Sequence, residues 1–359
     1  MASTAFTTLI TGGTGFLGRH LIEALLARGG GEAGPLRVLA RRASAELEAR
    51  GVECVEGAIQ DEDAVARALE GVRRVYHLAG PVVRATEDAS ERLFRTHVDG
   101  TRNLLRAAVE SGTVARVVHV SSSGTVGVSR DPKQVATEQS PYAIELARRW
   151  PYYLAKTYAE KTALEHARSG KPPEVVVVLP SLLLGPGDEA LSSTEDVLRF
   201  LRREIPATPP GGLALVDVRD AAAGLVAAME RGRAGERYLL NAANLPISTF
   251  FEMLEKVSGV SRPPLFVPRG RLAEISATAL SSVERLLGLK GGESIAFDMA
   301  CHHWYVDARK ARAELGFAPR PAEQTLRDTV EWLRDQVGLA PELGAMSLFT
   351  RPLNRLLGR

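Results

Sequence analysis

Short apolar runs alternate with amphipathic stretches through the first 180 residues of this chain. The apolar runs have the length and β-branched content of buried strands, and the stretches between them repeat apolar residues at helical spacing. The expected strands are 6–10, 36–40, 52–55, 75–78, 117–120 and 175–179, and the expected helices include 61–70 (capped by Asp61), 90–111 and 152–166. This alternation predicts an α/β fold, a doubly wound parallel sheet of the Rossmann type with helices on both faces.

The regular alternation ends after residue 180, where proline and glycine become frequent. A further strand is expected at 213–218, followed by a helix that starts at Asp220. We assign 1–180 and 213–248 to a dinucleotide-binding domain, 181–212 and 249–339 to a smaller substrate-binding region, and 340–359 to a basic amphipathic tail. The smaller region is expected over the carboxyl ends of the strands, where open sheets bind ligands. For the tail, docking on the protein or a partner subunit is favoured over a peripheral contact with a membrane.

A glycine-rich segment, TGGTGFLG, joins the first strand to the first helix. Gly12 permits a tight turn, Gly15 lets the backbone approach phosphates, and Gly18 lets helix and strand pack closely. The free N–H groups and the helix dipole favour a pyrophosphate at this point. The expected cofactor contacts here are Gly12, Thr14, Gly15, Phe16, Leu17 and Gly18.

Arg41 and Arg42 follow the second strand, where proteins that prefer NAD place an acidic residue against the adenosine ribose. Guanidinium groups suit bidentate phosphate binding. The sequence therefore predicts NADP(H) rather than NAD(H), with Arg41 as the main contact and Arg42 as its helper.

Tyr152 and Lys156 lie four residues apart in a helical stretch, so they share one face. A neighbouring ammonium stabilises a phenolate and lowers the pKa of the phenol, which lets the tyrosine exchange a proton with a carbonyl oxygen. Lys156 is also expected to hold the nicotinamide ribose. A serine hydroxyl at the end of the fifth strand can orient that carbonyl oxygen; Ser122 and Ser123 are the candidates, and Ser122 is preferred.

These motifs and several others resemble those of the extended short-chain dehydrogenases/reductases, in the NAD-dependent epimerase/dehydratase group. Members similar to dihydroflavonol 4-reductase and to 3β-hydroxysteroid dehydrogenase share most features. The further matching segments are HLAG at 77–80, GTRNLL at 100–105, YYLAKTYAE at 152–160 and KARAELGF at 310–317. The resemblance implies that Ser122, Tyr152 and Lys156 are catalytic.

The resemblance also implies cofactor contacts at Leu78, Ala79, Gly80 and Pro180. Ala58 stands where the family often has an aspartate that touches adenine, so this contact is expected to move to Asp61. His97 replaces the usual asparagine before the Gly-Thr helix segment, and a structural role is expected for it. Asp217 stands where a later family pattern usually has histidine.

The expected activity is reduction of a ketone or aldehyde on a fairly apolar small molecule, or oxidation of the alcohol. A nucleotide-sugar epimerase is an alternative, although Leu213 and Ala214 stand where such epimerases carry an arginine for the diphosphate. The arginines that remain as phosphate ligands for that alternative are Arg199, Arg202, Arg203 and Arg219. A non-catalytic NADP-binding sensor is the second alternative. Such a protein does not require the Tyr–Lys pair, so the presence of the pair counts against it.

The net charge of +2 gives no electrostatic case for a nucleic-acid partner. Cys54 and Cys301 have no metal-ligand spacing and suggest no disulfide framework, so we expect no metal site and a reducing, cytoplasmic location. The residues before the first strand lack a basic segment followed by an apolar core, so we expect no secretory signal; no apolar run is long enough to span a membrane. The family resemblance alone suggests a homodimer through a pair of helices.

Overall fold

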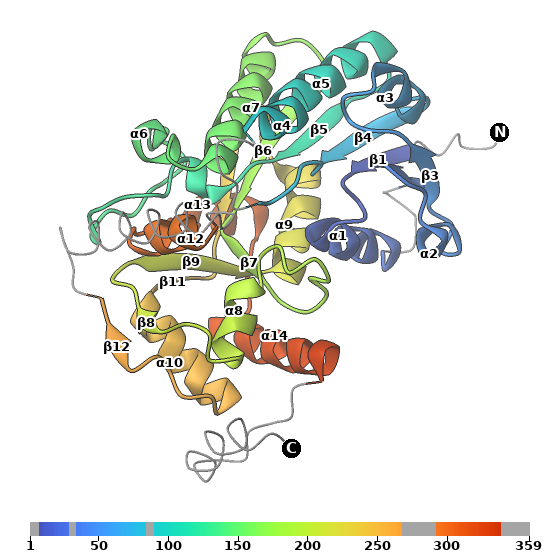
Figure 1. The fold of residues 1–359 in the computed structure, drawn as a ribbon. Coiled ribbons are helices and arrows are strands. Elements are labelled where there is room, and N and C mark those ends of the chain that lie inside the picture. The colour runs from blue at the N-terminus through green and yellow to red at the C-terminus, as the bar shows by residue number, and fades with distance from the viewer. Residues whose placement is uncertain (1–6, 29–33, 84–89, 268–291, 339–359) are drawn as a thin grey trace.

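The computed structural model describes residues 7–28, 34–83, 90–267 and 292–338 (Figure 1). Its centre is a sheet of seven parallel strands: β1 (Thr7–Thr11), β2 (Leu36–Ala40), β3 (Glu53–Glu56), β4 (Val72–His77), β5 (Arg116–Val120), β6 (Glu174–Pro180) and β10 (Arg237–Leu240). The strand order is β10-β6-β5-β4-β1-β2-β3. The chain order reverses between β1 and β4, which creates the crevice where such sheets bind ligands. The predicted doubly wound fold is confirmed.

Helices cover both faces of this sheet and the smaller layer beside it. They are α1 (Phe16–Leu26), α2 (Ala45–Glu48), α3 (Glu62–Ala68), α4 (Ser90–Phe94), α5 (Gly100–Ser111), α6 (Ile144–Ala147), α7 (Pro151–Arg168), α8 (Glu195–Leu201), α9 (Val218–Arg231), α10 (Ile247–Ser258), α12 (Gly292–Ala300), α13 (Arg309–Leu315) and α14 (Ala322–Val337). A π-helical turn, η2 (Arg95–Asp99), joins α4 to α5, and a 3-10 turn, η3 (Ser123–Thr125), follows β5.

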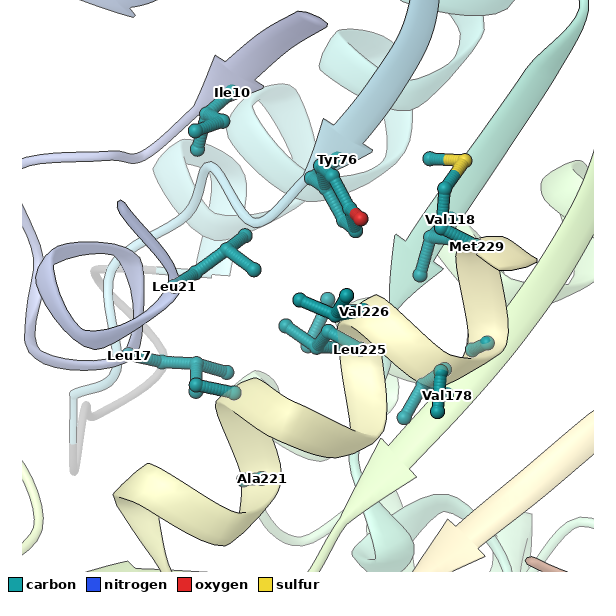
Figure 2. Close-up of a cluster of buried hydrophobic side chains, with 14 of the residues drawn as sticks. Ile10, Leu17, Leu21, Tyr76, Val118, Val178, Ala221, Leu225, Val226 and Met229 are labelled. Atoms are coloured by element: carbon teal, nitrogen blue, oxygen red, sulfur yellow. The ribbon is translucent and has the colours of Figure 1, made fainter. Parts of the chain in front are cut away.

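Two apolar cores sandwich the central sheet. On one face α1 and α9 pack together, and Leu21, Leu225 and Tyr76 meet between them and the strands (Figure 2). On the other face α3, α5 and α7 cover a second cluster that includes Leu9 and Val117. Neighbouring side chains on one strand point to opposite faces of the sheet, and both faces are buried. The strand sequences are therefore nearly continuous apolar runs.

A smaller layer lies beside the carboxyl edge of the central sheet (Figure 1). It contains a three-stranded sheet of β7 (Leu182–Leu184), β9 (Gly212–Asp217) and β11 (Ala243–Pro246), and a two-stranded sheet of β8 (Ala207–Thr208) and β12 (Leu265–Phe266). Helices α8, α10 and α14 pack around a third apolar core here. The strand predicted at 213–218 forms as β9, but it pairs with β7 and β11, and the last strand of the central sheet is β10.

Three helix boundaries test the sequence predictions. Asp61 caps α3 as predicted, because its carboxylate accepts a hydrogen bond of 3.0 Å from the Ala64 N–H. The expectation that Asp220 starts a helix was wrong: α9 is capped by Asp217, whereas the Asp220 carboxylate pairs with Arg320. The continuous helix expected at 90–111 is interrupted by η2.

Some predictions fall outside the described ranges. These are the first residues of the chain, the glycine stop at 29–31, the part of the substrate-binding region at 268–291, and the tail at 340–359. The division into two domains stays a prediction. Among the helices that the structure describes, none combines the length and apolar character needed to cross a membrane.

Candidate active site

The turn between β1 and α1 packs so closely that side chains are excluded at two of its glycines. Gly12 has φ of +75°, and a Cβ there would come within 2.9 Å of the Ala79 nitrogen. A Cβ on Gly18 would overlap the Gly12 carbonyl oxygen. Within the described chain, α1 has Gly15 as its N-cap, no side-chain cap and no acid in its first turn. Its first N–H groups and positive dipole end therefore suit an anionic pyrophosphate, as the predicted dinucleotide requires.

Gly18→Ala is expected to weaken NADPH binding at least tenfold, because the new methyl group must push α1 away from the turn. Fluorescence titration of the purified variant with NADPH measures the change. Gly51→Ala is the control for a general loss of stability: alanine is strained there because φ is +77°, but its Cβ meets nothing within 4 Å and the residue is far from the glycine turn in sequence. Unchanged affinity in Gly18→Ala would show that the close contact of helix and turn is not needed for the cofactor.

A chain of buried hydrogen bonds joins this turn to α5 and η2. The Ala79 N–H donates to Thr11 Oγ1 at 3.2 Å, and Thr11 Oγ1 lies 2.7 Å from His77 Nδ1. On the other side, His77 Nε2 lies 3.1 Å from Thr101 Oγ1, whose hydrogen goes to the His97 carbonyl at 2.6 Å. Thr101 must then accept from His77 Nε2–H, so Nδ1 accepts from Thr11. Burial lowers the pKa of His77 to about 3, which keeps this imidazole neutral.

His97 lies where α5, the turn after β4 and α7 meet. Its ring packs against Gly80, where an added Cβ would overlap the imidazole. Its Nε2 lies 3.1 Å from the Pro81 carbonyl oxygen and so donates to it. Its ring meets the Tyr152 ring edge-on at 5.7 Å between centroids. These contacts are in keeping with the structural role expected for His97, and they also bring it against the predicted catalytic tyrosine.

Helix α7 carries Tyr152 and Lys156 one turn apart, and the Lys156 side chain reaches the sheet. The Lys156 ammonium, 5% exposed, donates to the Val120 carbonyl at the end of β5 at 2.8 Å. Burial lowers the pKa of Lys156 to about 8, and burial raises the pKa of Tyr152. The two shifts have the same cause, because a low-dielectric setting disfavours the ammonium and the phenolate when each is considered alone.

The serine cluster after β5 presents its hydroxyls differently. Ser122 is half-buried, and its Oγ accepts a hydrogen bond of 3.3 Å from the Gly124 N–H as the cap of η3. Ser123 is 6% exposed. The neighbours Ser121 and Thr125 point inward and donate to the Glu160 carboxylate, at 2.6 and 2.9 Å. Ser122 is therefore the more open hydroxyl of the two candidates.

Glu160 was not singled out as a functional residue from the sequence. One signal was available, because Glu160 follows Lys156 by one helical turn and so shares the face that carries the predicted catalytic residues. Its burial and its partner Arg237, from β10, appear only in the folded chain.

The other predicted cofactor contacts lie on the same carboxyl edge of the sheet. Arg41 and Arg42 are exposed directly after β2. Leu78, Ala79 and Gly80 follow β4, and Pro180 ends β6. Thr14 is exposed in the turn, Phe16 is half-buried and packs on His20 with 5.8 Å between ring centroids, and the Leu17 side chain is in the core. Asp61 is exposed and caps α3.

Two expectations concern metals and cysteines. Cys54 and Cys301 are both free thiols. Across the part of the chain that the structure describes, no group of His, Cys, Asp and Glu side chains is arranged to hold a metal ion.

Taken together, the parallel sheet, its reversal of strand order and the glycine turn define a Rossmann protein that binds a dinucleotide. Residues 8–241 match the NAD dependent epimerase/dehydratase family, and the chain belongs to that family.

Named relatives agree with this assignment. Sterol demethylase protein B of Methylococcus capsulatus is 33% identical and aligns with 92% of this chain and 99% of its own length. Tetraketide alpha-pyrone reductase 1 of Arabidopsis thaliana is 30% identical over 72% of this chain and 82% of its own. Among solved structures, a nucleoside-diphosphate-sugar epimerase from Pseudomonas aeruginosa superimposes with a TM-score of 0.72 at 26% identity, covering 92% of this chain and 98% of the epimerase. This protein is an NAD(P)-dependent oxidoreductase of the extended short-chain dehydrogenase/reductase type.

Proposed function

We propose that the protein uses NADP(H) to reduce a ketone or aldehyde group on a fairly apolar small molecule. The observation that carries the proposal is the anchoring of the Lys156 ammonium at the end of β5, which places α7 and its Tyr–Lys pair beside the serine turn. Lys156 is anchored on the Val120 carbonyl, Tyr152 lies one turn earlier on α7, and the half-buried Ser122 follows Val120 by two residues.

Each side chain has a defined task in this reaction. A nicotinamide cofactor held by the glycine turn after β1 and by Lys156 would supply the hydride for the carbonyl carbon. Ser122 donates a hydrogen bond to the carbonyl oxygen and holds it toward Tyr152, which gives its phenolic proton to that oxygen. The Lys156 ammonium would stabilise the negative charge left on Tyr152, because a nearby opposite charge favours the phenolate. Solvent then returns the proton to Tyr152.

The aromatic surroundings of Tyr152 support an apolar substrate. The Tyr153 and Trp304 rings lie 4.8 Å apart between centroids, and both are half-buried. They cover Gly124, whose missing side chain leaves the space that the Tyr153 ring occupies beside the serine turn. Aromatic faces of this kind favour flat apolar groups. The names of the two relatives point to sterol and tetraketide pyrone chemistry, which also involves apolar molecules.

The nucleotide-sugar alternative loses one of its candidate ligands. Arg219 donates to the Asp217 carboxylate at 2.7 Å and to Asp328 at 2.5 Å, so its guanidinium is already paired with two acids. Ala214, near the position of the usual diphosphate arginine, is buried in the smaller sheet. Without a charge at that point, a sugar diphosphate would lack its main ligand.

Cofactor binding and ketone reduction together test the proposal. NADPH should quench the protein fluorescence with a micromolar or lower Kd, and the enzyme should then oxidise NADPH in the presence of some members of a panel of aryl, steroid and polyketide ketones. A UDP-sugar panel run in parallel should give no epimer. Tight NADPH binding together with epimerised sugar and no NADPH consumption would refute the reductase proposal.

Replacing Arg41 and Arg42 together with alanine is expected to raise the KM for NADPH by about 10- to 100-fold, because each guanidinium lost removes charge-assisted hydrogen bonds to the 2′-phosphate. The KM for NADH should change less than about threefold, since NADH has no such phosphate. Steady-state kinetics with both cofactors measure the split, and Arg50→Ala, which removes a nearby surface arginine paired with Glu23, is the control. An equal effect on both cofactors would contradict the preference for NADP(H).

A further inference from the structure

Glu160 is a buried carboxylate that the proposed reaction does not use directly. Its side chain has an exposed fraction of 0% and lies one helical turn after Lys156 on α7. One oxygen, Oε2, accepts from Ser121 Oγ at 2.6 Å and from Thr125 Oγ1 at 2.9 Å. The other oxygen, Oε1, accepts from Arg237 Nη1 at 3.2 Å. Both carboxylate oxygens are therefore occupied by donors.

The two hydroxyl donors lie on either side of Ser122 in the turn that follows β5. Thr125 Oγ1 also lies 2.9 Å from the Ser122 carbonyl oxygen, but a hydroxyl has one hydrogen to donate. An ionised Glu160 attracts that hydrogen more strongly than a neutral carbonyl does, because charge-assisted hydrogen bonds are stronger. The charge of Glu160 thus adds two side-chain hydrogen bonds to the backbone hydrogen bonds that hold the turn carrying Ser122.

Arg237 ties this arrangement to a distant part of the chain. Its guanidinium, 15% exposed, comes from β10 and also donates to the backbone carbonyls of Glu138 and, at 3.3 Å, Ser140. The Tyr142 ring lies 5.3 Å from it. A buried carboxylate needs such a partner, because an uncompensated charge in the interior is strongly unfavourable.

We propose that Glu160 and Arg237 form a positioning pair for catalysis: the pair holds the 121–125 turn so that Ser122 faces the substrate, and it supplies the negative charge that acts on Lys156 along α7. Neither residue touches the substrate, so both act through Ser122 and Lys156. The inference rests on the proposed function, since it assigns these two residues their roles.

The surroundings of Lys156 support the electrostatic part. Burial lowers the pKa of Lys156, and the charge of Glu160 raises it again. The other titratable groups near the ammonium are Tyr152 on α7, His77 on β4, His97 on η2 and His119 on β5. Burial lowers the pKa values of the three histidines, so they are neutral at working pH. Burial raises the pKa of Glu160, while Arg237, Ser121 and Thr125 lower it.

The test compares Glu160→Gln, the double variant Glu160→Gln/Arg237→Met, and wild type. The glutamine keeps the shape of the side chain but removes its charge. We expect kcat for ketone reduction to fall about 10- to 50-fold in both variants, while the KM for NADPH changes less than threefold. The alkaline limb of kcat/KM, where Lys156 loses its proton, should move to lower pH in both variants because the favourable anion is gone, and further in Glu160→Gln, where the Arg237 cation has lost its counter-charge.

The double variant separates positioning from simple stability. Glu160→Gln leaves the buried Arg237 without a counter-charge and should lower the melting temperature. The double variant leaves no uncompensated charge, so its melting temperature should lie closer to that of wild type. If the double variant also recovers the wild-type kcat and alkaline limb, the pair is only structural and the inference is wrong. Asp220→Asn is the matched control: it breaks a partly buried ion pair with Arg320 and should lower stability without moving the pH profile.

A readout without substrate distinguishes failure of this inference from failure of the proposed function. The Kd for NADPH, measured by fluorescence between pH 6 and 10, reports the charge of Lys156 if its ammonium holds the ribose. A midpoint that moves to lower pH in both variants supports the inference even when no ketone is reduced. A midpoint that stays unmoved in both variants overturns it, whatever the activity of the wild type.

Discussion

Tyr152→Phe is expected to lower kcat for ketone reduction by about 10²–10⁴-fold, the usual contribution of a positioned acid. The phenylalanine keeps the ring, its edge-on contacts with His97 and Tyr153, and the packing of α7, but it removes the only proton that the phenol can donate. NADPH affinity should therefore stay within about twofold of wild type. Steady-state kinetics and fluorescence titration measure the two quantities on the same preparation.

The matched control is Tyr158→Phe on the same helix, because Tyr158 is 42% exposed and its loss should leave kcat unchanged. A Tyr152→Phe variant that keeps more than a tenth of the wild-type kcat would show that another group protonates the carbonyl oxygen. A variant that loses NADPH affinity and activity together would show that Tyr152 acts in binding rather than in proton transfer.

Lys156→Met is expected to remove activity and, at the same time, to make the protein more stable at pH 7. The ammonium is needed to stabilise the phenolate, so kcat should fall by at least 10²-fold. Burial lowers the pKa of Lys156 to about 8 from an ordinary value of about 10.4, so at pH 7 the buried charge costs about 3 kcal/mol. Its hydrogen bond to the Val120 carbonyl returns about 1 kcal/mol. The variant should gain about 2 kcal/mol in free energy of unfolding.

The sign of the pH dependence follows from proton binding. Between about pH 8 and 10.4 the unfolded wild type binds more protons at this lysine than the folded protein, so wild-type stability rises with pH in that window. The gain in free energy of unfolding that Lys156→Met brings is therefore fully present below pH 8 and is lost by about pH 10.4. Urea unfolding of wild type and variant measures this gain at pH 7 and its loss at pH 10. Lys171→Met is the control, because Lys171 is exposed. A variant less stable than wild type at pH 7 would show that Lys156 is not a buried charge that the fold must accommodate.

These two variants test two parts of the proposed proton transfer. Tyr152→Phe removes the proton that is transferred, and Lys156→Met removes the positive charge that favours the transfer. A buried ammonium that lowers the stability of the fold is expected to have a catalytic role, since functional sites commonly contain groups that destabilise the folded protein.

Local pattern in the sequence was enough to predict the central fold. The strands at 36–40 and 117–120 and the glycine turn after β1 follow from apolar runs, helical spacing and the conformational freedom of glycine, and each is found where it was expected. The shared face of Tyr152 and Lys156 follows from the helical repeat alone. Such features depend on residues within one or two turns of each other, so a single stretch of sequence contains the information.

Tertiary structure decided which elements and side chains meet. The predicted strand at 213–218 formed, yet its partners are β7 and β11, because pairing depends on edges that distant segments supply. Ser122 and Ser123 have the same side chain, and only the packing of η3 makes one more open than the other. Glu160 and Arg237 lie 77 positions apart.

The sequence by itself therefore determined the type of fold, the glycine-rich turn after the first strand and the spacing of the Tyr–Lys pair, since local sequence pattern sets these. The burial that lowers the pKa of Lys156, the hydrogen-bonded chain through His77, and the ion pair behind the serine turn exist only after folding. They depend on desolvation and on contacts between segments far apart in the chain, and no local pattern encodes either.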